Sequence, residues 1–229
     1  MRESIKQFVK ICAETLPISE PIYEFGALQV EGQEGFADLR PLFPGKKDVG
    51  ADLRKGPVVD VLLDLHDIDL PSESVGTVLI LDTLEHVEYP RKAIENAHTI
   101  LKKDGIVIIT SVMNFAIHDY PQDFWRFTPE AFRSLLKQFS YSFVDALGNP
   151  KFPHTILGLG LKGLGHRDLV SEFLRQYDGW KKTSVQSPCE PSVWKKLIKS
   201  FLPPILFTIY RKLYPKKIKH NPKNGFGDE

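Results

Sequence analysis

Residues 75–110 read VGTVLILDTLEHVEYPRKAIENAHTILKKDGIVIIT, and this stretch decides the fold. The run 75–81 is apolar, which predicts a buried strand. Apolar side chains recur at helical spacing across residues 90–102, which predicts an amphipathic helix. Residues 103–105 (Lys-Asp-Gly) predict a turn, and residues 106–110 predict another buried strand. A strand, a helix and a strand in this order predict a parallel pair joined by a right-handed crossover.

The same alternation continues on both sides of this stretch. Further strands are predicted at residues 21–25, 49–52 and 58–63, with a closing pair at 141–147 and 154–161. Helices are predicted at residues 2–13, from Thr128 onward, where Thr128 caps and Pro129 follows, and within part of 162–190. This pattern predicts an α/β fold with a mostly parallel sheet and helices on both of its faces.

Composition sets limits on the class of protein. The chain has 229 residues, of which 42% are hydrophobic and 26% charged, values typical of a globular protein that buries its own core. Its two cysteines, Cys12 and Cys189, form no CxxC pair, so a disulfide framework or a cysteine zinc site is not expected. The charged residues near the N-terminus leave no signal-peptide core, and no apolar run reaches about 18 residues. A cytoplasmic location is expected.

Charge is distributed unevenly along the chain. From residue 191 onward nine Lys and Arg face two acids, a net charge of +7, whereas the first 190 residues carry −6. Residues 192–217 alternate apolar and basic side chains at helical spacing, interrupted at Pro203 and Pro204. This pattern predicts an interfacial segment at an anionic membrane surface. The alternative is a helix packed on the body of the protein or on a second copy in a homodimer. Nucleic acid is a third and less favoured partner.

Acidic residues stand at the ends of the first four predicted strands. These are Glu24, Asp52, Asp64 and Asp82. Ligands of open parallel sheets bind beyond the carboxyl ends of the strands, and a carboxylate there can accept hydrogen bonds from ribose hydroxyls. The alternative is that each Asp caps the turn or helix that follows it.

The loop after the first strand indicates which nucleoside is expected. It reads EFGALQVEG from Glu24 to Gly32 and contains neither GxGxxG nor GxxxxGK[ST]. Its two acids would repel a pyrophosphate. A cationic ligand without phosphate suits the loop better, and S-adenosylmethionine is such a ligand.

At Leu84-Glu85-His86-Val87, and again at Leu101-Lys102-Lys103-Asp104-Gly105, the sequence resembles the class I S-adenosylmethionine-dependent methyltransferases, in particular the methyltransferase type 11 group. The resemblance covers about residues 20–160. It implies a Rossmann-like seven-stranded sheet of order 3-2-1-4-5-7-6 whose seventh strand is antiparallel.

The resemblance also implies roles for particular residues in binding S-adenosylmethionine. Glu24 and Gly26 match the loop around the methionine part, and Asp52, followed by Leu53, matches the ribose-binding acid. Asp64 with Leu65 matches the position that reads adenine, and Asp82 matches the position beside the sulfonium and amino groups. The sequence departs from the family in one respect, because Gly26 is the only glycine before Gly32 in a loop that usually has two or three.

The segment after the fifth strand is predicted to hold the methyl acceptor. Residues 113–128 read MNFAIHDYPQDFWRFT and emerge at the ligand-binding edge. His118 is the predicted catalytic base, oriented by Asp119 or Asp123, and Asp119 is the second predicted catalytic residue. Substrate contacts are predicted for His86, Tyr120, Asp123, Trp125 and Arg126. The alternative for this segment is a packed lid in which Arg126 pairs with Asp123, and for His86 it is ordering of its own loop. No HxH or HExxH pattern occurs, so no metal is predicted.

These expectations together describe an enzyme. The sequence predicts a methyltransferase domain at 1–165, a helical extension at 166–190 and a basic amphipathic tail at 191–229. The expected reaction is O-methylation of a hydroxyl-bearing small molecule or a glycan or glycolipid precursor, at the inner face of a membrane. The alternative is a non-catalytic domain of the same fold that binds a membrane or a partner through its tail.

Overall fold

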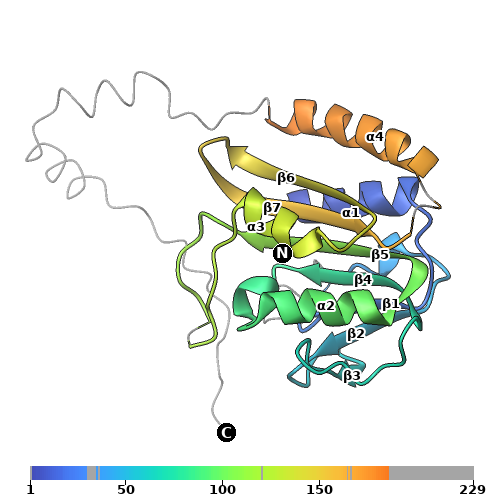
Figure 1. Cartoon of the computed structure of the whole chain (residues 1–229). Coiled ribbons are helices and arrows are strands. Elements are labelled where there is room, and N and C mark those ends of the chain that lie inside the picture. Colours follow the sequence, from blue (N-terminus) through green and yellow to red (C-terminus); the bar gives the residue numbers. More distant parts are fainter. Residues whose placement is uncertain are drawn as a thin grey trace, which may run out of the picture. The chain divides into compact units, whose positions relative to one another are not determined.

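Seven strands form one sheet, which organises the fold (Figure 1). The structure is a computed structural model, and it describes residues 2–29, 35, 37–119, 121–163, 165 and 167–185. The strands are β1 (Ile22–Phe25), β2 (Asp48–Asp52), β3 (Val61–Leu62), β4 (Val75–Leu81), β5 (Leu101–Val112), β6 (Tyr141–Asn149) and β7 (Phe152–Leu161). Their order is β3-β2-β1-β4-β5-β7-β6; the first five are parallel, and β7 is antiparallel to both its neighbours. The predicted order and the antiparallel seventh strand are confirmed.

Helices cover both faces of the sheet, as predicted (Figure 1). One face carries α1 (Glu3–Thr15) and α4 (Arg167–Val185), and the other carries α2 (Pro90–Ile100) and α3 (Pro129–Leu136). Two short 3₁₀ turns, η1 (Arg40–Leu42) and η2 (Leu84–His86), lie in the connections. Every residue of β4 is buried, because this central strand has neighbours on both edges and helices over both faces.

The third and fifth strands differ from the sequence-based boundaries. β3 is limited to two residues because the chain before it is held in a turn: Val58 adopts a φ of +70°, and the Asp60 carboxylate accepts a hydrogen bond from the Gly50 amide at 2.8 Å. β5 starts at Leu101, which pairs with Val75, and the register then shifts before Ile106 pairs with Thr77. The predicted turn at 103–105 is therefore part of an irregular strand.

The last described helix packs into the main core. Phe173 and Tyr177 of α4 contact Phe8 of α1, with ring centroids 6.2 and 6.0 Å apart, and the Tyr177 hydroxyl donates to Asp145 of β6 at 2.8 Å. The described residues from 2 to 185 belong to one compact unit. The predicted divisions at 165 and 190 stay predictions, and the predicted tail lies outside the described residues. Within the part of the chain that the structure describes, no helix is both long and apolar enough to span a bilayer.

Candidate functional site

A cavity of about 690 Å³ opens at the carboxyl edge of the sheet, between the ends of β1, β2 and β4 and the segment after β5. The strand order reverses between β1 and β4, which is where open α/β sheets bind their ligands. Ten residues predicted from the sequence line this one cavity: Glu24, Gly26, Asp52, Leu53, Asp64, Leu65, Asp82, His86, His118 and Asp119.

The loop after β1 lies tightly against the loop after β4. Gly26 has a φ of +82°, and a Cβ placed on it would lie 2.2 Å from Oγ1 of Thr83. That hydroxyl is within hydrogen-bond distance of the Phe25 and Leu81 carbonyls, at 3.2 and 3.0 Å. A side chain at position 26 would therefore break the junction of the two strands that flank the cavity.

Asp52 ends β2 with a fixed and nearly buried carboxylate, 8% exposed. Its oxygens accept hydrogen bonds from the Leu28 amide at 3.3 Å and the Arg54 amide at 2.9 Å. A carboxylate oxygen has two lone pairs, so both oxygens keep capacity for a ligand hydroxyl. The geometry fits the predicted ribose contact, and it also contains the capping contact that was the alternative.

Asp64 and Leu65 line the cavity from the segment after β3. The Asp64 carboxylate accepts from the His66 amide at 2.8 Å and lies 2.8 Å from Nδ1 of the same histidine. The Leu65 carbonyl accepts from the side-chain amide of Asn96 at 2.9 Å. These contacts fix the backbone where the resemblance implies that adenine is read.

Three carboxylates line the cavity, and two of them, on Glu24 and Glu85, are buried. Burial, helped by the nearby charges of Asp48 and Asp38, raises the pKa of Glu24 to about 8. Burial also raises the pKa of Asp82, with Arg2 opposing it at 3.5 Å. Burial and the charge of Asp82 raise the pKa of Glu85 to about 7. The protein only partly compensates these carboxylates for the hydration that they lose, so a bound cation in the cavity would be favourable.

Glu85 and Gln29 are two polar lining residues that the sequence analysis did not predict. Glu85 belongs to the Leu84–Val87 motif, and that motif was its only sequence signal. Gln29 is 7% exposed, and its Oε1 accepts from the Gly35 amide at 2.9 Å. Its Nε2 is buried without a hydrogen-bond partner among the described residues, which leaves a donor at the cavity. Nothing in the sequence pattern marks Gln29.

His118 lines the cavity from the segment after β5. Its backbone amide donates to Asp123 at 2.8 Å, and its ring Nδ1 lies 3.2 Å from the Ala116 carbonyl. The ring meets the rings of Phe115 and His86 edge to face, with centroids 4.9 and 4.7 Å apart. These contacts fix the imidazole plane, as expected for a group that must act in one direction.

Asp119 follows His118 at the rim of the cavity. It adopts a φ of +51°, an uncommon conformation for a residue other than glycine, and its carboxylate lies 3.8 Å from Arg54 Nη1. His86 is held by a 2.6 Å contact between Nδ1 and the Gln122 carbonyl, and it also lines the cavity. The loop-ordering alternative for His86 and its predicted substrate contact are therefore compatible.

Three further residues that were predicted to contact substrate, Asp123, Trp125 and Arg126, form hydrogen bonds within the protein. The Asp123 carboxylate is 1% exposed and accepts from the Arg126 guanidinium at 2.5 and 2.7 Å, and these hydrogen bonds lower the pKa of Asp123. The Trp125 indole donates to the Val87 and Glu88 carbonyls at 3.0 and 3.2 Å. None of these three side chains lines the cavity, which matches the packed-lid alternative, and a substrate contact by them stays a prediction. Tyr120 lies outside the described residues.

Comparison with known proteins agrees with this architecture. Residues 46–109 match the model of a methyltransferase domain family. No curated protein sequence matches the chain. Burkholderia thailandensis 1,6-didemethyltoxoflavin-N1-methyltransferase, solved with 1,6-didemethyltoxoflavin and S-adenosylhomocysteine bound, is 17% identical with a TM-score of 0.55, covering 70% of this chain and 79% of that one.

Two further solved structures are similar. A SAM-dependent methyltransferase from Archaeoglobus fulgidus is 14% identical with a TM-score of 0.55, covering 71% of this chain and 95% of that one. A possible histamine N-methyltransferase from Thermotoga maritima is 18% identical with a TM-score of 0.50, covering 69% and 92%. At these identities the structures show a shared fold. Together with the matched segment they confirm the resemblance to the class I methyltransferases.

Proposed function

Since the chain has the class I methyltransferase fold and a matching methyltransferase segment, we propose that it transfers a methyl group from S-adenosylmethionine to a hydroxyl-bearing small molecule or glycan. One observation carries the proposal. The cavity at the strand switch point is lined by the carboxylates of Glu24, Asp82 and Glu85, and His118 lines it from the segment after β5.

The chain's own residues fit S-adenosylmethionine. A ligand with a sulfonium and an ammonium group would place positive charge beside the Glu24 and Asp82 carboxylates, in addition to the charge of Arg2, which lies 3.5 Å from Asp82. We assign the ligand's carboxylate to Nε2 of Gln29, which has no hydrogen-bond partner among the described residues. We assign the ribose hydroxyls to Asp52 and the adenine to the Asp64–Leu65 segment.

Methyl transfer requires mainly that the acceptor oxygen is correctly positioned and that water is excluded from the site. When bound, S-adenosylmethionine supplies an electrophilic methyl group that is transferred by in-line displacement. The protein has to hold the acceptor oxygen in line and to exclude water. The walls formed by Phe25, Leu81 and Val112, which line the cavity, would keep water out.

His118 is the residue that we assign to activation of the acceptor hydroxyl. Its Nδ1 is occupied by the Ala116 carbonyl, so the second ring nitrogen, Nε2, is left with a free lone pair. In the direct form of this mechanism Nε2 takes the hydroxyl proton as the oxygen attacks, and Asp119 at the rim passes it to solvent.

The acceptor class and the location of the protein also form part of the proposal. The basic, amphipathic pattern of residues 192–217 favours the inner surface of an anionic membrane, where glycan and glycolipid precursors are found. The pattern of the same residues would also suit a homodimer contact.

Titration calorimetry with S-adenosylmethionine tests the function. We expect one site per chain, with product formation detected when hydroxyl-bearing acceptors are supplied. His118→Gln should lower turnover and leave cofactor affinity within about twofold, because the residue lies away from the strand ends that would hold the nucleoside. Absence of binding up to about 1 mM would favour the non-catalytic alternative.

A further inference from the structure

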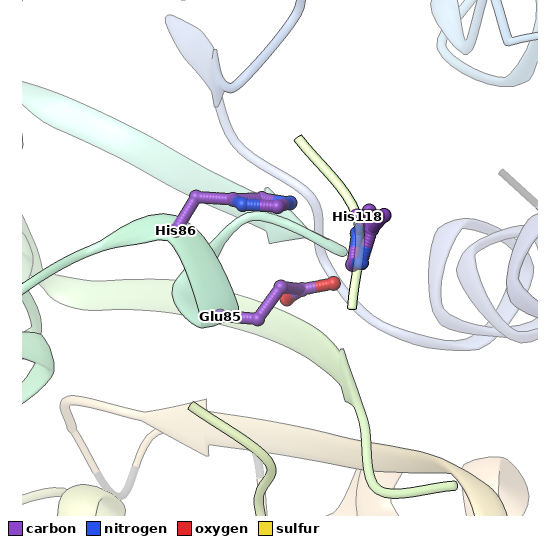
Figure 2. A group of neighbouring side chains, drawn as sticks. All are labelled: Glu85, His86 and His118. Carbon is purple, nitrogen blue, oxygen red and sulfur yellow. The ribbon is translucent and has the colours of Figure 1, made fainter. Parts of the chain in front are cut away.

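Glu85, His86 and His118 form a compact cluster on the acceptor side of the cavity (Figure 2). Glu85 and His86 belong to the η2 turn after β4, and His118 comes from the segment after β5. One carboxylate oxygen and one nitrogen from each imidazole all lie within 4.8 Å of one another. Figure 2 shows the Glu85 carboxylate and the His86 ring both directed toward His118.

Both imidazoles are held through the same ring atom. Nδ1 of His86 lies 2.6 Å from the Gln122 carbonyl, and Nδ1 of His118 lies 3.2 Å from the Ala116 carbonyl and 3.4 Å from the Asp123 carboxylate. A carbonyl can only accept, so each Nδ1 carries the hydrogen and each Nε2 keeps a lone pair. Metal-binding histidines are oriented in this way, with one nitrogen donating to an outer oxygen and the other free for the ion.

Glu85 carries a buried carboxylate. Its residue is 1% exposed, and Oε2 accepts one hydrogen bond from Ser111 Oγ at 2.6 Å. Among the described residues no Lys, Arg or His forms a salt bridge with it. A buried carboxylate is unfavourable unless hydrogen bonds or a positive charge compensate for the lost hydration.

We propose that Glu85, His86 and His118 bind one divalent transition-metal ion of the zinc class. Two imidazoles and one carboxylate are an established ligand set for zinc, and three protein ligands leave a position open for another molecule. Bonds of about 2.0–2.1 Å place tetrahedral ligand atoms roughly 3.3 Å apart, so the side chains would close by about 1.5 Å. The open position faces the cavity, because all three residues line it.

The inference rests on the proposed function and refines how the acceptor is activated. The hydroxyl oxygen of the acceptor would occupy the open position, where the positive ion lowers its pKa. The O–H proton then leaves to water or to Asp119, the oxygen forms its new bond to the methyl carbon, and the S–CH₃ bond breaks to give a neutral thioether. In this form His118 is a ligand, and the ion replaces it as the group that promotes loss of the proton.

Cobalt titration tests the site without relying on turnover. Full-length protein is treated with a chelator, and Co²⁺ is added while its visible absorption is followed. We expect one equivalent with the intense bands of a four- or five-coordinate site. Zn²⁺ should displace it. Glu85→Gln, His86→Gln and His118→Gln should each weaken binding at least tenfold.

His98→Gln is the matched control, because His98 lies on α2 against Phe139 and does not line the cavity. It should leave the titration unchanged. Absence of a one-equivalent Co²⁺ complex would overturn the proposal, and so would equal binding by the three cluster variants. Calorimetry with S-adenosylmethionine on the same samples separates the two claims: cofactor binding without Co²⁺ binding contradicts only the metal site.

Activity provides the second readout. The zinc-loaded enzyme should exceed the chelator-treated enzyme in turnover, and the addition of Zn²⁺ should not restore His86→Gln. Equal turnover with and without the ion would contradict its role in activation and would favour direct proton transfer to His118.

Discussion

The Glu24 carboxylate lies at the end of β1 with 6% of the residue exposed, and its pKa is raised to about 8. In the unfolded chain this carboxyl has an ordinary pKa of 4.5. Between pH 4.5 and pH 8 the folded protein therefore keeps a proton on Glu24 that the unfolded chain has lost. The free energy of unfolding should consequently fall as pH rises from about 5 to 8. We predict that Glu24→Gln removes about 3 kcal/mol of the stability lost between pH 6 and pH 9. Denaturant unfolding at both pH values measures this.

Glu130→Gln is the control for that experiment, since the Glu130 side chain is 81% exposed. Its pH dependence should match that of the unmodified protein. If Glu24→Gln shows the same loss of stability as the unmodified chain, the Glu24 carboxylate is ionised throughout this range.

Asp52 is the residue whose removal should weaken cofactor binding most directly. We predict that Asp52→Ala weakens the binding of S-adenosylmethionine by roughly 1.5–3 kcal/mol, as expected for loss of a charged hydrogen-bond partner. Calorimetry gives the affinity, and circular dichroism checks the fold. Asp69→Ala, at an exposed residue that does not line the cavity, should bind normally. An unchanged affinity in Asp52→Ala would exclude the ribose contact.

The sequence identified the acids at the strand ends because each directly follows a recognisable apolar run. It could not identify Glu85 or Gln29, because their importance depends on burial by segments distant in the chain. It also could not decide between substrate contact and internal support for Asp123 and Arg126, since both readings need the same residue types. The 2.5 and 2.7 Å contacts within the loop show internal pairing.

The junction between β1 and β4 is the element most sensitive to substitution. We predict that Gly26→Ala is destabilising and abolishes cofactor binding, because its Cβ would lie 2.2 Å from Thr83 Oγ1. Gly45→Ala is a matched control, with a φ of +74° against +82° but nothing within 4 Å of the new methyl group. Both variants carry a similar backbone penalty of about 1–2 kcal/mol, so thermal unfolding should show an additional loss of about 1–3 kcal/mol only for Gly26→Ala. Equal losses would show that the contact with Thr83 is unimportant.

Strand boundaries were predictable where apolar runs end at polar residues, and β4 was predicted to the residue. β3 and β5 were not, for opposite reasons. The apolar run before β3 is held in a turn by the Asp60–Gly50 contact, which is not visible in the local sequence. β5 begins early because β4 offers Leu101 a pairing partner that outweighs the turn preference of residues 103–105.

At the scale of the whole chain, the effect of a truncation should depend on whether it removes α4. We predict that a chain ending at residue 190 keeps its stability and its affinity for S-adenosylmethionine. A chain ending at residue 165 should lose stability, because it exposes the apolar surface of Phe8 and Phe143 that Phe173 and Tyr177 cover. Thermal unfolding and calorimetry on both chains measure the difference. Equal stability of the two would show that α4 is dispensable.

The segment after residue 190 gives a separate prediction. The full chain should co-sediment with anionic vesicles at low salt and less at high salt, because eight basic residues lie between Lys195 and Lys219 and their attraction to lipid is screened by ions. Neutral vesicles should retain it poorly, and the chain ending at residue 190 should remain in solution. If that shorter chain sediments equally well, the tail is not the anchor. If it becomes insoluble, the tail belongs to the packed fold or to a dimer contact.

The indole N–H of Trp125 donates hydrogen bonds to the carbonyls of Val87 and Glu88, the two residues that directly follow His86. Any ligand that shifts this turn must change the surroundings of that ring, which is 44% exposed. The native fluorescence of the protein should therefore respond to occupancy on the acceptor side. Trp180, on α4 at the opposite face of the sheet, would contribute a constant background. The chain has a third tryptophan, Trp194, so replacing Trp125 with Phe would show which part of the response belongs to Trp125. Candidate acceptors could then be screened optically without a dye or a radiolabel.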